Sequence, residues 1–322
     1  MQHAPLAYHD VKTAADRIAG RVRPVAVAPT EPGAFGDVEV RLALELLQFT
    51  GTFKARGALN FVEAHREAGT LPEAGVTIAS GGNAGVACAW AARRAGARST
   101  VFLPATAPDV KVRRLRELGA DVRLVGSEYA EAAAACEEFA ARSGALASHA
   151  YDHPLIAAGA GTLFEEIHRR VPGLDTVVVA VGGGGLLAGV ATAARAHGVR
   201  TVAVEPENCR ALHAALEAGR PVDVPVRSVA ADSLGARRVS ADALAVAQDD
   251  SVRPVLVPDA AIVRTRRLLW EERRLAVEHG AAAALAAVLP PEGPGHGYRA
   301  EPGEKICVVL CGANTDPADL AA

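Results

Sequence analysis

Short apolar runs alternate with longer segments of helical periodicity from residue 76 onward, and this rhythm constrains the fold more than any other feature of the chain. Runs at 76–79, 99–103 and 121–125 are each followed by a helical segment, and a second series continues with a helix at 155–170 and a strand at 176–181. Strands that alternate with helices form mainly parallel sheets covered by helices on both faces. The sequence therefore predicts an α/β fold.

The first series of strands and helices predicts one compact unit within the chain of 322 residues. We expect a smaller compact unit at 75–149 and a larger one formed by 1–74 together with 150–322. The net charge of −3 and the aromatic content of 4% argue against nucleic acid as a partner. We also expect no membrane span and no secretory signal at 1–10. The five cysteines include no C-x-x-C pair, which favours the reducing cytoplasm.

A lysine stands at the start of a helix predicted over 53–66. Lys54 follows Phe53 and is surrounded by small residues. The positive end of a helix and desolvation both disfavour a charged amine there. Such a lysine loses its proton readily and can form a Schiff base with an aldehyde. The alternative is an ordinary lysine on a surface loop.

A glycine run follows an apolar strand and opens a helix; its residues are Gly182, Gly183, Gly184 and Gly185, with Leu186 next. Backbone N–H groups of such a loop can converge on a phosphate. A dinucleotide site is an alternative, because Gly183-x-Gly185-x-x-Ala188 fits the G-x-G-x-x-A pattern and Glu205 ends the next strand. A tight packing turn between strand and helix is a second alternative.

Two further segments follow predicted strands. The loop with Ser80, Gly81, Asn83 and Ala84 places a hydroxyl, an amide and N–H donors at a helix start, which suits a carboxylate. The alternative is a helix N-cap with a glycine turn. Cys311 closes the last strand, either as a buried cysteine or as a weak, neutral hydrogen-bond partner for a ring nitrogen.

These segments follow one another in the order of a known family. The chain resembles the serine/threonine dehydratases, which belong to the tryptophan-synthase-β-like class of pyridoxal-phosphate enzymes. The stretches that carry the resemblance are 48–58, 80–85, 104–112, 119–122, 152–162, 182–186, 204–206 and 311–314. The resemblance implies a fold type II enzyme with two open, twisted, mainly parallel sheets, helices on both faces, and the cofactor between the two domains.

The resemblance also implies a role for each candidate residue. Lys54 would hold pyridoxal 5'-phosphate as a Schiff base and later act on the substrate, Phe53 would lie beside the ring, and Cys311 would face the ring nitrogen. Asn83 would bond the ring hydroxyl. The phosphate would be held by Gly182, Gly183, Gly184, Gly185 and Leu186, and the substrate carboxylate by Ser80, Gly81 and Ala84.

The implied activity is dehydration and deamination of a β-hydroxy amino acid, L-threonine or L-serine, to a 2-oxo acid and ammonia, in a homodimer. The alternatives are a serine racemase of the same fold, a nicotinamide-dependent oxidoreductase and a non-catalytic binding protein. Serine racemases resemble this chain but have a serine at the position of Gly81.

The chain departs from the family at three places. Ala84 stands where threonine-specific members have a histidine, and the family's Glu-Pro-Ala-Gly stretch reads Glu278-His279-Gly280-Ala281. The family's cation site keeps Glu205 and the carbonyl of Cys209 but has Ala211 as its third position, so we expect at most a monovalent cation.

Overall fold

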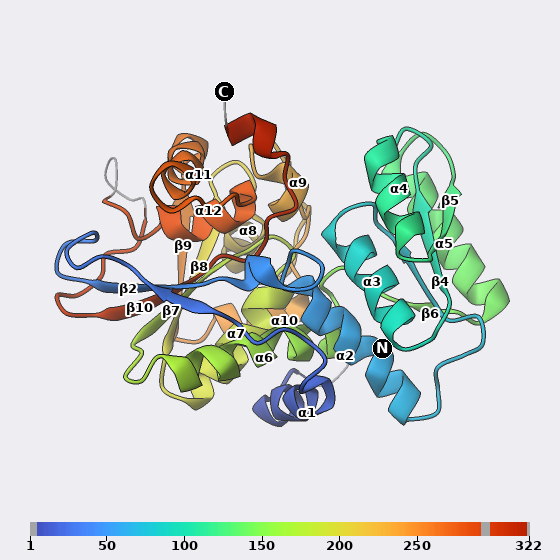
Figure 1. Cartoon of the computed structure of the whole chain (residues 1–322), viewed down its shortest axis with the longest axis horizontal. Coiled ribbons are helices and arrows are strands. Elements are labelled where there is room, and N and C mark those ends of the chain that lie inside the picture. Colours follow the sequence, from blue (N-terminus) through green and yellow to red (C-terminus); the bar gives the residue numbers. More distant parts are fainter. Residues whose placement is uncertain (1–4, 291–296, 321–322) are drawn as a thin grey trace.

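Two sheets form the framework of the computed structural model, which describes residues 5–290 and 297–320. One sheet has six strands in the order β1-β2-β10-β7-β8-β9, and the other has four in the order β5-β4-β3-β6. In Figure 1 the smaller sheet lies on the right and the larger one on the left, each with helices around it. The predicted α/β class with two mainly parallel sheets is confirmed.

The six-stranded sheet is parallel except where β1 pairs antiparallel with β2. Its strands are β1 (Val27–Pro29), β2 (Glu39–Ala43), β10 (Lys305–Val309), β7 (Thr176–Ala180), β8 (Arg200–Pro206) and β9 (Val252–Val257). Every residue of the central strand β7 is buried, in keeping with the apolar run that follows Thr176. Strand β9 was not predicted, because Pro254 cannot donate a backbone hydrogen bond. The sheet tolerates this proline because β9 lies at an edge.

The four-stranded sheet is parallel throughout and lies between residues 76 and 147. Its strands are β3 (Val76–Ala79), β4 (Ser99–Leu103), β5 (Asp121–Leu124) and β6 (Leu146–Ala147). The strands predicted at 76–79 and 99–103 have the observed bounds, and the one predicted at 121–125 is one residue shorter. The first series of strands and helices thus forms its own sheet.

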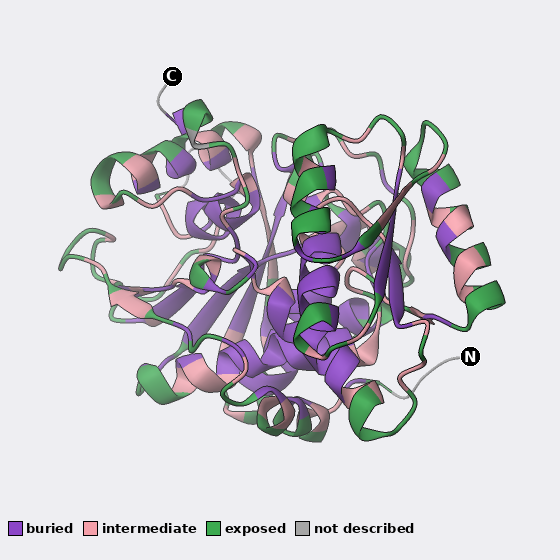
Figure 2. Cartoon of the chain, turned by 45° about the vertical axis from the view of Figure 1, so that its right-hand side comes forward, coloured by how far each residue is buried: buried purple, intermediate pink, exposed green. Residues whose placement is uncertain are grey.

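Helices cover both sheets. Their bounds are α1 (Tyr8–Ile18), α2 (Lys54–Glu67), α3 (Asn83–Arg94), α4 (Asp109–Glu117), α5 (Tyr129–Ser143), α6 (Pro154–Arg170), α7 (Gly185–Ala196), α8 (Ala211–Ala218), α9 (Ala231–Leu234), α10 (Ala241–Ala247), α11 (Asp259–Arg273) and α12 (His279–Ala286), with short 3-10 turns η1 (Glu45–Leu47) and η2 (Pro317–Leu320). Figure 2 shows buried residues concentrated in the strands and central helices and exposed residues on the outer helices. Among the described residues, no helix combines the length and apolar character needed to cross a membrane.

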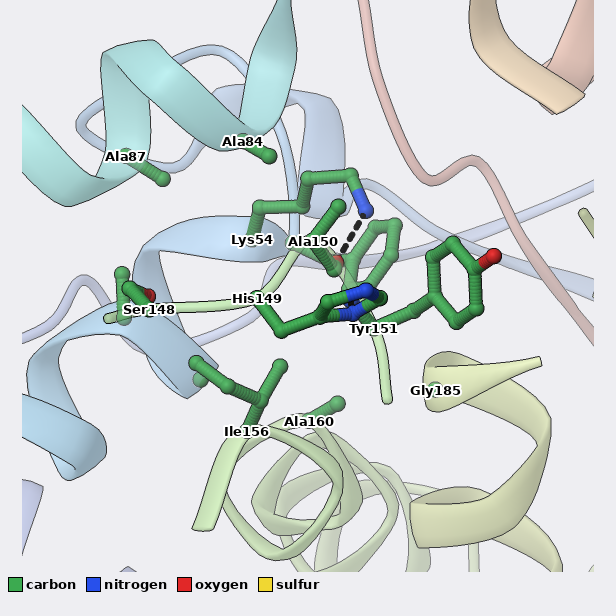
Figure 3. A pocket seen from close by; sticks show the side chains of 13 residues that line it. Lys54, Ala84, Ala87, Ser148, His149, Ala150, Tyr151, Ile156, Ala160 and Gly185 are labelled. Carbon is green, nitrogen blue, oxygen red and sulfur yellow. Dashed lines mark hydrogen bonds between the residues drawn. The ribbon is translucent and has the colours of Figure 1, made fainter. Parts of the chain in front are cut away.

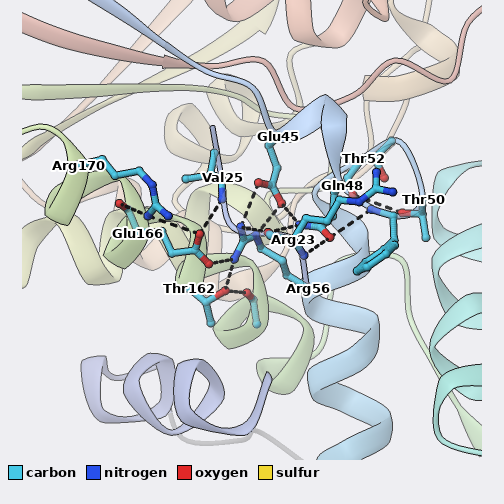
Figure 4. A network of polar contacts seen from close by, with 12 residues as sticks. Arg23, Val25, Glu45, Gln48, Thr50, Thr52, Arg56, Thr162, Glu166 and Arg170 are labelled. Carbon is cyan, nitrogen blue, oxygen red and sulfur yellow. Dashed lines mark hydrogen bonds and ion pairs between the residues drawn. The ribbon is translucent and has the colours of Figure 1, made fainter. Parts of the chain in front are cut away.

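A buried ion network fixes the first turn of α2 (Figure 4). Arg56 is fully buried, and its Nε lies 2.6 Å from Oε1 of Glu45 in η1. Another guanidinium nitrogen lies 2.7 Å from Oε1 of Glu166 and 3.2 Å from the hydroxyl of Thr162, both on α6. These contacts hold α2 against η1 and α6, two residues after Lys54.

Two histidine rings lie close together where α6 meets the end of α7. The ring centroids of His168 and His197 lie 4.2 Å apart, and Phe164 stacks on His168 at 5.8 Å. Among the described residues, the buried Nδ1 of His168 has no hydrogen-bond partner. Burial and the neighbouring His197 lower the pKa of His168 below its usual value.

Replacement of Arg56 tests the buried network. We expect Arg56→Met to lower the free energy of unfolding by about 3–5 kcal/mol, because the buried Glu45 and the partly buried Glu166 would lose their counter-charge. Urea denaturation measures the change. Arg41→Met is the matched control, since Arg41 pairs with Glu39 at the surface and such pairs contribute about 0–1 kcal/mol. Equal effects of the two substitutions would contradict the role given to the network.

The lowered pKa of His168 predicts that the stability of the protein depends on pH. The unfolded chain protonates His168 near pH ~6.5, whereas the folded protein protonates it only at lower pH. Its contribution is therefore complete above about pH 6.5 and is lost as the pH falls toward the folded pKa. Urea denaturation from about pH 7.5 to 5.5 should show a smaller loss of stability in His168→Phe than in the wild type. The exposed His9, replaced in His9→Gln, should retain the wild-type slope, and an unchanged slope in His168→Phe would refute the assignment.

Candidate active site

A cavity of about 470 Å³ lies where the carboxyl ends of β7 and β10 meet the first turns of α2 and α7. In α/β folds, ligands usually bind at the carboxyl ends of the parallel strands. The cavity brings together all the residues predicted to bind the cofactor, which are Phe53, Lys54, Asn83, Gly182, Gly183, Gly184, Gly185, Leu186 and Cys311. Segments up to 258 residues apart in sequence (53 to 311) thus share one site.

Lys54 is the first residue of α2, as the sequence predicts for a lysine at a helix start. Its Nζ donates a hydrogen bond of 3.0 Å to the carbonyl of Ala150 and lies 4.8 Å from the centre of the Phe53 ring (Figure 3). Burial lowers the pKa of Lys54, and nearby Cys311 and Glu278 oppose this shift. The amine is therefore easier to deprotonate than a surface lysine.

Residues 148–151 cover Lys54 from the side of α6, and sequence reasoning missed them. In Figure 3, Ser148, His149, Ala150 and Tyr151 line a cavity that also contains Lys54. The hydroxyl of Tyr151 donates to the carbonyl of Arg238 at 3.0 Å. One sequence signal marks this segment, since it follows the carboxyl end of β6 and precedes the resembling stretch 152–162.

The glycine loop packs too closely for side chains. A Cβ at Gly183 would lie 2.2 Å from Cδ1 of Tyr151, and one at Gly184 would lie 2.3 Å from the Cβ of Ala243. Gly184 also has a φ of 93°, a backbone conformation that favours glycine. Helix α7 begins at Gly185, and the first N–H groups of a helix have no intrahelical acceptor. The loop is therefore a cradle suited to a phosphate.

The remaining lining fits the rest of pyridoxal phosphate. Thr52 lines the cavity, and its buried hydroxyl has no hydrogen-bond partner among the described residues. Burial raises the pKa of the Cys311 thiol to about 12, so this group is neutral at physiological pH. An amine for the aldehyde, a cradle for the phosphate and a neutral thiol occur in one cavity. Sequence reasoning did not include Thr52.

The loop after β3 divides its residues between two spaces. Ala84 lines the cavity with Lys54, whereas Gly81 lines a cleft of about 1580 Å³ between the lobes. The hydroxyl of Ser80 accepts a hydrogen bond from the N–H of Gly82 at 3.3 Å. The cleft is crossed by an ion pair of 3.0 Å between Lys111 on α4 and Asp232 on α9. The structure thus places Gly81 and Ala84 at different sides of the loop.

Glu278 lies between this cleft and the cavity and was noted in the sequence only as part of a departing stretch. Its carboxyl is buried and accepts hydrogen bonds from the side chain of Asn83 and the N–H of Asn314. Burial raises the pKa of Glu278, and these two hydrogen-bond partners oppose the shift. The contact with Asn83 joins residues 195 positions apart, and no local pattern reveals it.

Glu205 is fully buried, and its carboxylate is already bonded. Its oxygens accept from the N–H of Leu212 at 2.7 Å and the N–H of His213 at 3.0 Å. The carboxylate is therefore not presented to a ribose, which weighs against the dinucleotide alternative. The thiol of Cys209 donates to the carbonyl of Leu234 at 3.1 Å. Within 5–290 and 297–320, no group of three or more His, Cys, Asp or Glu side chains is arranged to hold a metal ion.

Comparison with known proteins agrees with this geometry. Residues 24–312 match the family model described as "Pyridoxal-phosphate dependent enzyme". An L-threonine ammonia-lyase of Geobacter sulfurreducens is 36% identical over 318 residues, covering 97% of this chain and 76% of that protein. A serine dehydratase-like protein of Rattus norvegicus is 37% identical and covers 85% of each chain. The structure of maize serine racemase superposes with a TM-score of 0.88 at 27% identity, covering 99% of this chain and 96% of that one.

Proposed function

This chain belongs to the family of pyridoxal-phosphate dependent enzymes, and we propose that it removes water and ammonia from L-threonine or L-serine to give a 2-oxo acid. The observation that carries the proposal is the amine of Lys54, whose pKa desolvation lowers and which shares one cavity with the glycine cradle and Cys311. The names of the threonine ammonia-lyase and the serine dehydratase-like relative support this activity.

The residues of the cavity are assigned by what each can hold. Lys54 would bind the cofactor aldehyde, with Phe53 beside the ring and Cys311 at the ring nitrogen. Asn83 would bond the ring hydroxyl, and the loop that runs from Gly182 to Leu186 would bind the phosphate. When bound, pyridoxal phosphate supplies an electron sink for the electron pair left at the substrate's α-carbon.

Lys54 is the proposed general base. Once the substrate amine has taken its place on the cofactor aldehyde, Nζ would be a free amine, and its lowered pKa would let it take the α-proton from the substrate. The loop after β3, with Ser80, Gly81 and Ala84, would hold the substrate carboxylate through its N–H groups at the start of α3. The β-hydroxyl then leaves with a proton as water, and the released enamine hydrolyses to the 2-oxo acid and ammonium.

Cys311 bears on the choice between elimination and side reactions. A thiol with a pKa of about 12 keeps its proton and cannot act as a counter-charge that keeps the ring nitrogen protonated. The weaker electron sink shortens the life of the carbanion, which favours elimination over transamination.

Four further properties belong to the proposal. The four-stranded sheet supports 75–149 as a small mobile domain and 1–74 with 150–322 as the large one. The likeness to the serine/threonine dehydratases supports a homodimer. The described cysteines are all unpaired and buried, which supports a cytoplasmic location. A monovalent cation would use the carbonyl of Cys209 and Glu205, whose oxygens already accept N–H groups.

Substitution of Lys54 tests the assignment directly. We expect Lys54→Ala to lose the visible absorbance of bound cofactor and to lower turnover of L-threonine and L-serine by at least about 100-fold, with an intact fold by circular dichroism. Lys305→Ala is the control. This lysine bonds a carbonyl at the surface and is the first residue of β10, whereas the site lies at the carboxyl ends of the strands. Retained elimination in purified Lys54→Ala would refute the proposal.

The racemase alternative rests on the likeness to maize serine racemase, and Gly81 separates the two activities. Racemisation needs an acid on the face opposite Lys54, and Gly81 has no side chain to supply one. We expect D-serine to form from L-serine roughly 100-fold more slowly than pyruvate, measured by chiral chromatography.

A matched pair of variants sharpens this test. Gly81→Ser adds a hydroxyl after a shift of Leu103, whose Cδ2 lies 2.5 Å from the Cβ position, whereas Gly82→Ser adds one into open space. Gly81→Ser should increase D-serine formation and Gly82→Ser should not. Comparable rates of D-serine and pyruvate in the wild type would replace the dehydratase proposal with the racemase.

A further inference from the structure

The carboxyl group of Glu278 has a built position at the junction of the lobes. It is 6% exposed and lies at the N-terminal end of α12, where the N–H of Glu278 donates to the carbonyl of Gly312 at 3.0 Å. A Cβ at Gly312 would lie 2.2 Å from Oε1 of Glu278, so the glycine leaves room for the carboxyl. The backbone of both segments therefore holds this group in place.

The carboxyl points its oxygens at one side chain of the opposite lobe. Nδ2 of Asn83 lies 3.0 Å from Oε1 and 2.9 Å from Oε2 of Glu278. The N–H of Asn314 donates to Oε1 at 3.1 Å. Asn83 begins α3 beside the four-stranded sheet, whereas Glu278 and Asn314 belong to the lobe of the six-stranded sheet.

The other end of the Asn83 amide is bonded as well. Its Oδ1 accepts from Nδ2 of Asn314 at 2.7 Å, and the same Nδ2 donates to the carbonyl of Thr50 at 2.9 Å. A flipped amide would set its oxygen against the Glu278 carboxylate and its NH2 against that of Asn314, so the network permits one orientation. Nδ2 carries two hydrogens, and the two oxygens of one carboxylate can share a single one, which leaves the other for a ligand in the cavity that Asn83 lines.

Building on the proposed function, we propose that Glu278 is a positioning residue that directs the amide of Asn83 toward the ring hydroxyl of bound pyridoxal phosphate. Because Asn83 and its two partners belong to different lobes, the amide has this orientation only while the lobes are docked. Glu278 thereby links the geometry of the cofactor site to the closure of the cleft between the lobes.

The charge of Glu278 also acts on Lys54. It raises the pKa of Lys54 and so opposes the larger effect of burial. Removal of this charge should lower the pKa of Lys54 further and move the acidic limb of the activity profile to lower pH. A purely structural residue would lower activity without this movement.

The experiment compares holoenzymes of the wild type, Glu278→Gln, Asn83→Ala and the double variant. We expect Glu278→Gln to shift the visible band of bound pyridoxal phosphate and to weaken its affinity, titrated by fluorescence, roughly tenfold. The double variant should bind no more weakly than Asn83→Ala, because Glu278 acts through Asn83.

Glu304→Gln is the matched control. Glu304 is also buried, and its carboxylate accepts a hydrogen bond of 2.7 Å from Tyr298. It adjoins the amino end of β10, whereas the site lies at the carboxyl ends of the strands. This variant should lower the melting temperature and leave the band and the affinity unchanged. The control separates the loss of any buried carboxylate from the loss of Glu278.

Two results would overturn the proposal: a wild-type band and affinity in Glu278→Gln, or losses that add in the double variant. Neither readout needs turnover. A protein that binds pyridoxal phosphate with the expected changes but converts no β-hydroxy amino acid would refute the proposed function and support the role of Glu278.

Discussion

The position of the active-site lysine depends on the ion pairs that the buried guanidinium of Arg56 makes. Its two carboxylate partners, Glu45 and Glu166, come from η1 and α6, so one charge joins three elements. A buried pair of this kind adds little net stability over an apolar core, yet loss of one partner is costly because the others remain charged. The network therefore specifies a position more than it adds stability. That position is the first turn of α2, where Lys54 begins the helix.

The parallel sheets then bring the other segments to Lys54. In a parallel sheet the carboxyl ends of all strands point to the same side of the molecule, and the helices that follow begin there. The glycine loop follows β7, Cys311 follows β10, and Asn83 follows β3 of the smaller sheet. The cavity thus receives backbone N–H groups and helix starts from several directions, which suits an anionic cofactor. Burial then adjusts the ionisable groups, lowering the pKa of Lys54 and raising that of Cys311.

The contacts between the lobes also orient a side chain of the site. Asn83 bonds Glu278 and Asn314 across the junction, and Lys111 pairs with Asp232 across the cleft. The first contact is partly buried and specific in orientation, whereas the second is exposed and of small energy. Correct orientation of the amide therefore accompanies docking, and the outer ion pair adds to it weakly.

The sequence by itself determined the fold class, most strands and the cofactor-binding candidates that the cavity brings together, but not Thr52, Tyr151 or Glu278, which also line it. Alternating periodicity and glycine-rich turns are local properties of the sequence. Loops that follow parallel strands meet at the carboxyl ends of those strands, so these local patterns also predict a shared site. Local patterns failed where neighbours in space decided the outcome. Pro254 concealed strand β9 at the sheet edge, and helix α11 ends at Arg273, where Arg274 has a φ of 56°.

Only the tertiary structure decided the contacts that orient the site. The carbonyl of Ala150 on Lys54 and the carboxyl of Glu278 on Asn83 join residues 96 and 195 positions apart. Burial and hydrogen-bond geometry depend on which atoms meet after folding, and residue type and spacing along the chain do not contain them. The sequence thus determined which groups are present at the site, and the packing of the two lobes decided their orientation and their protonation.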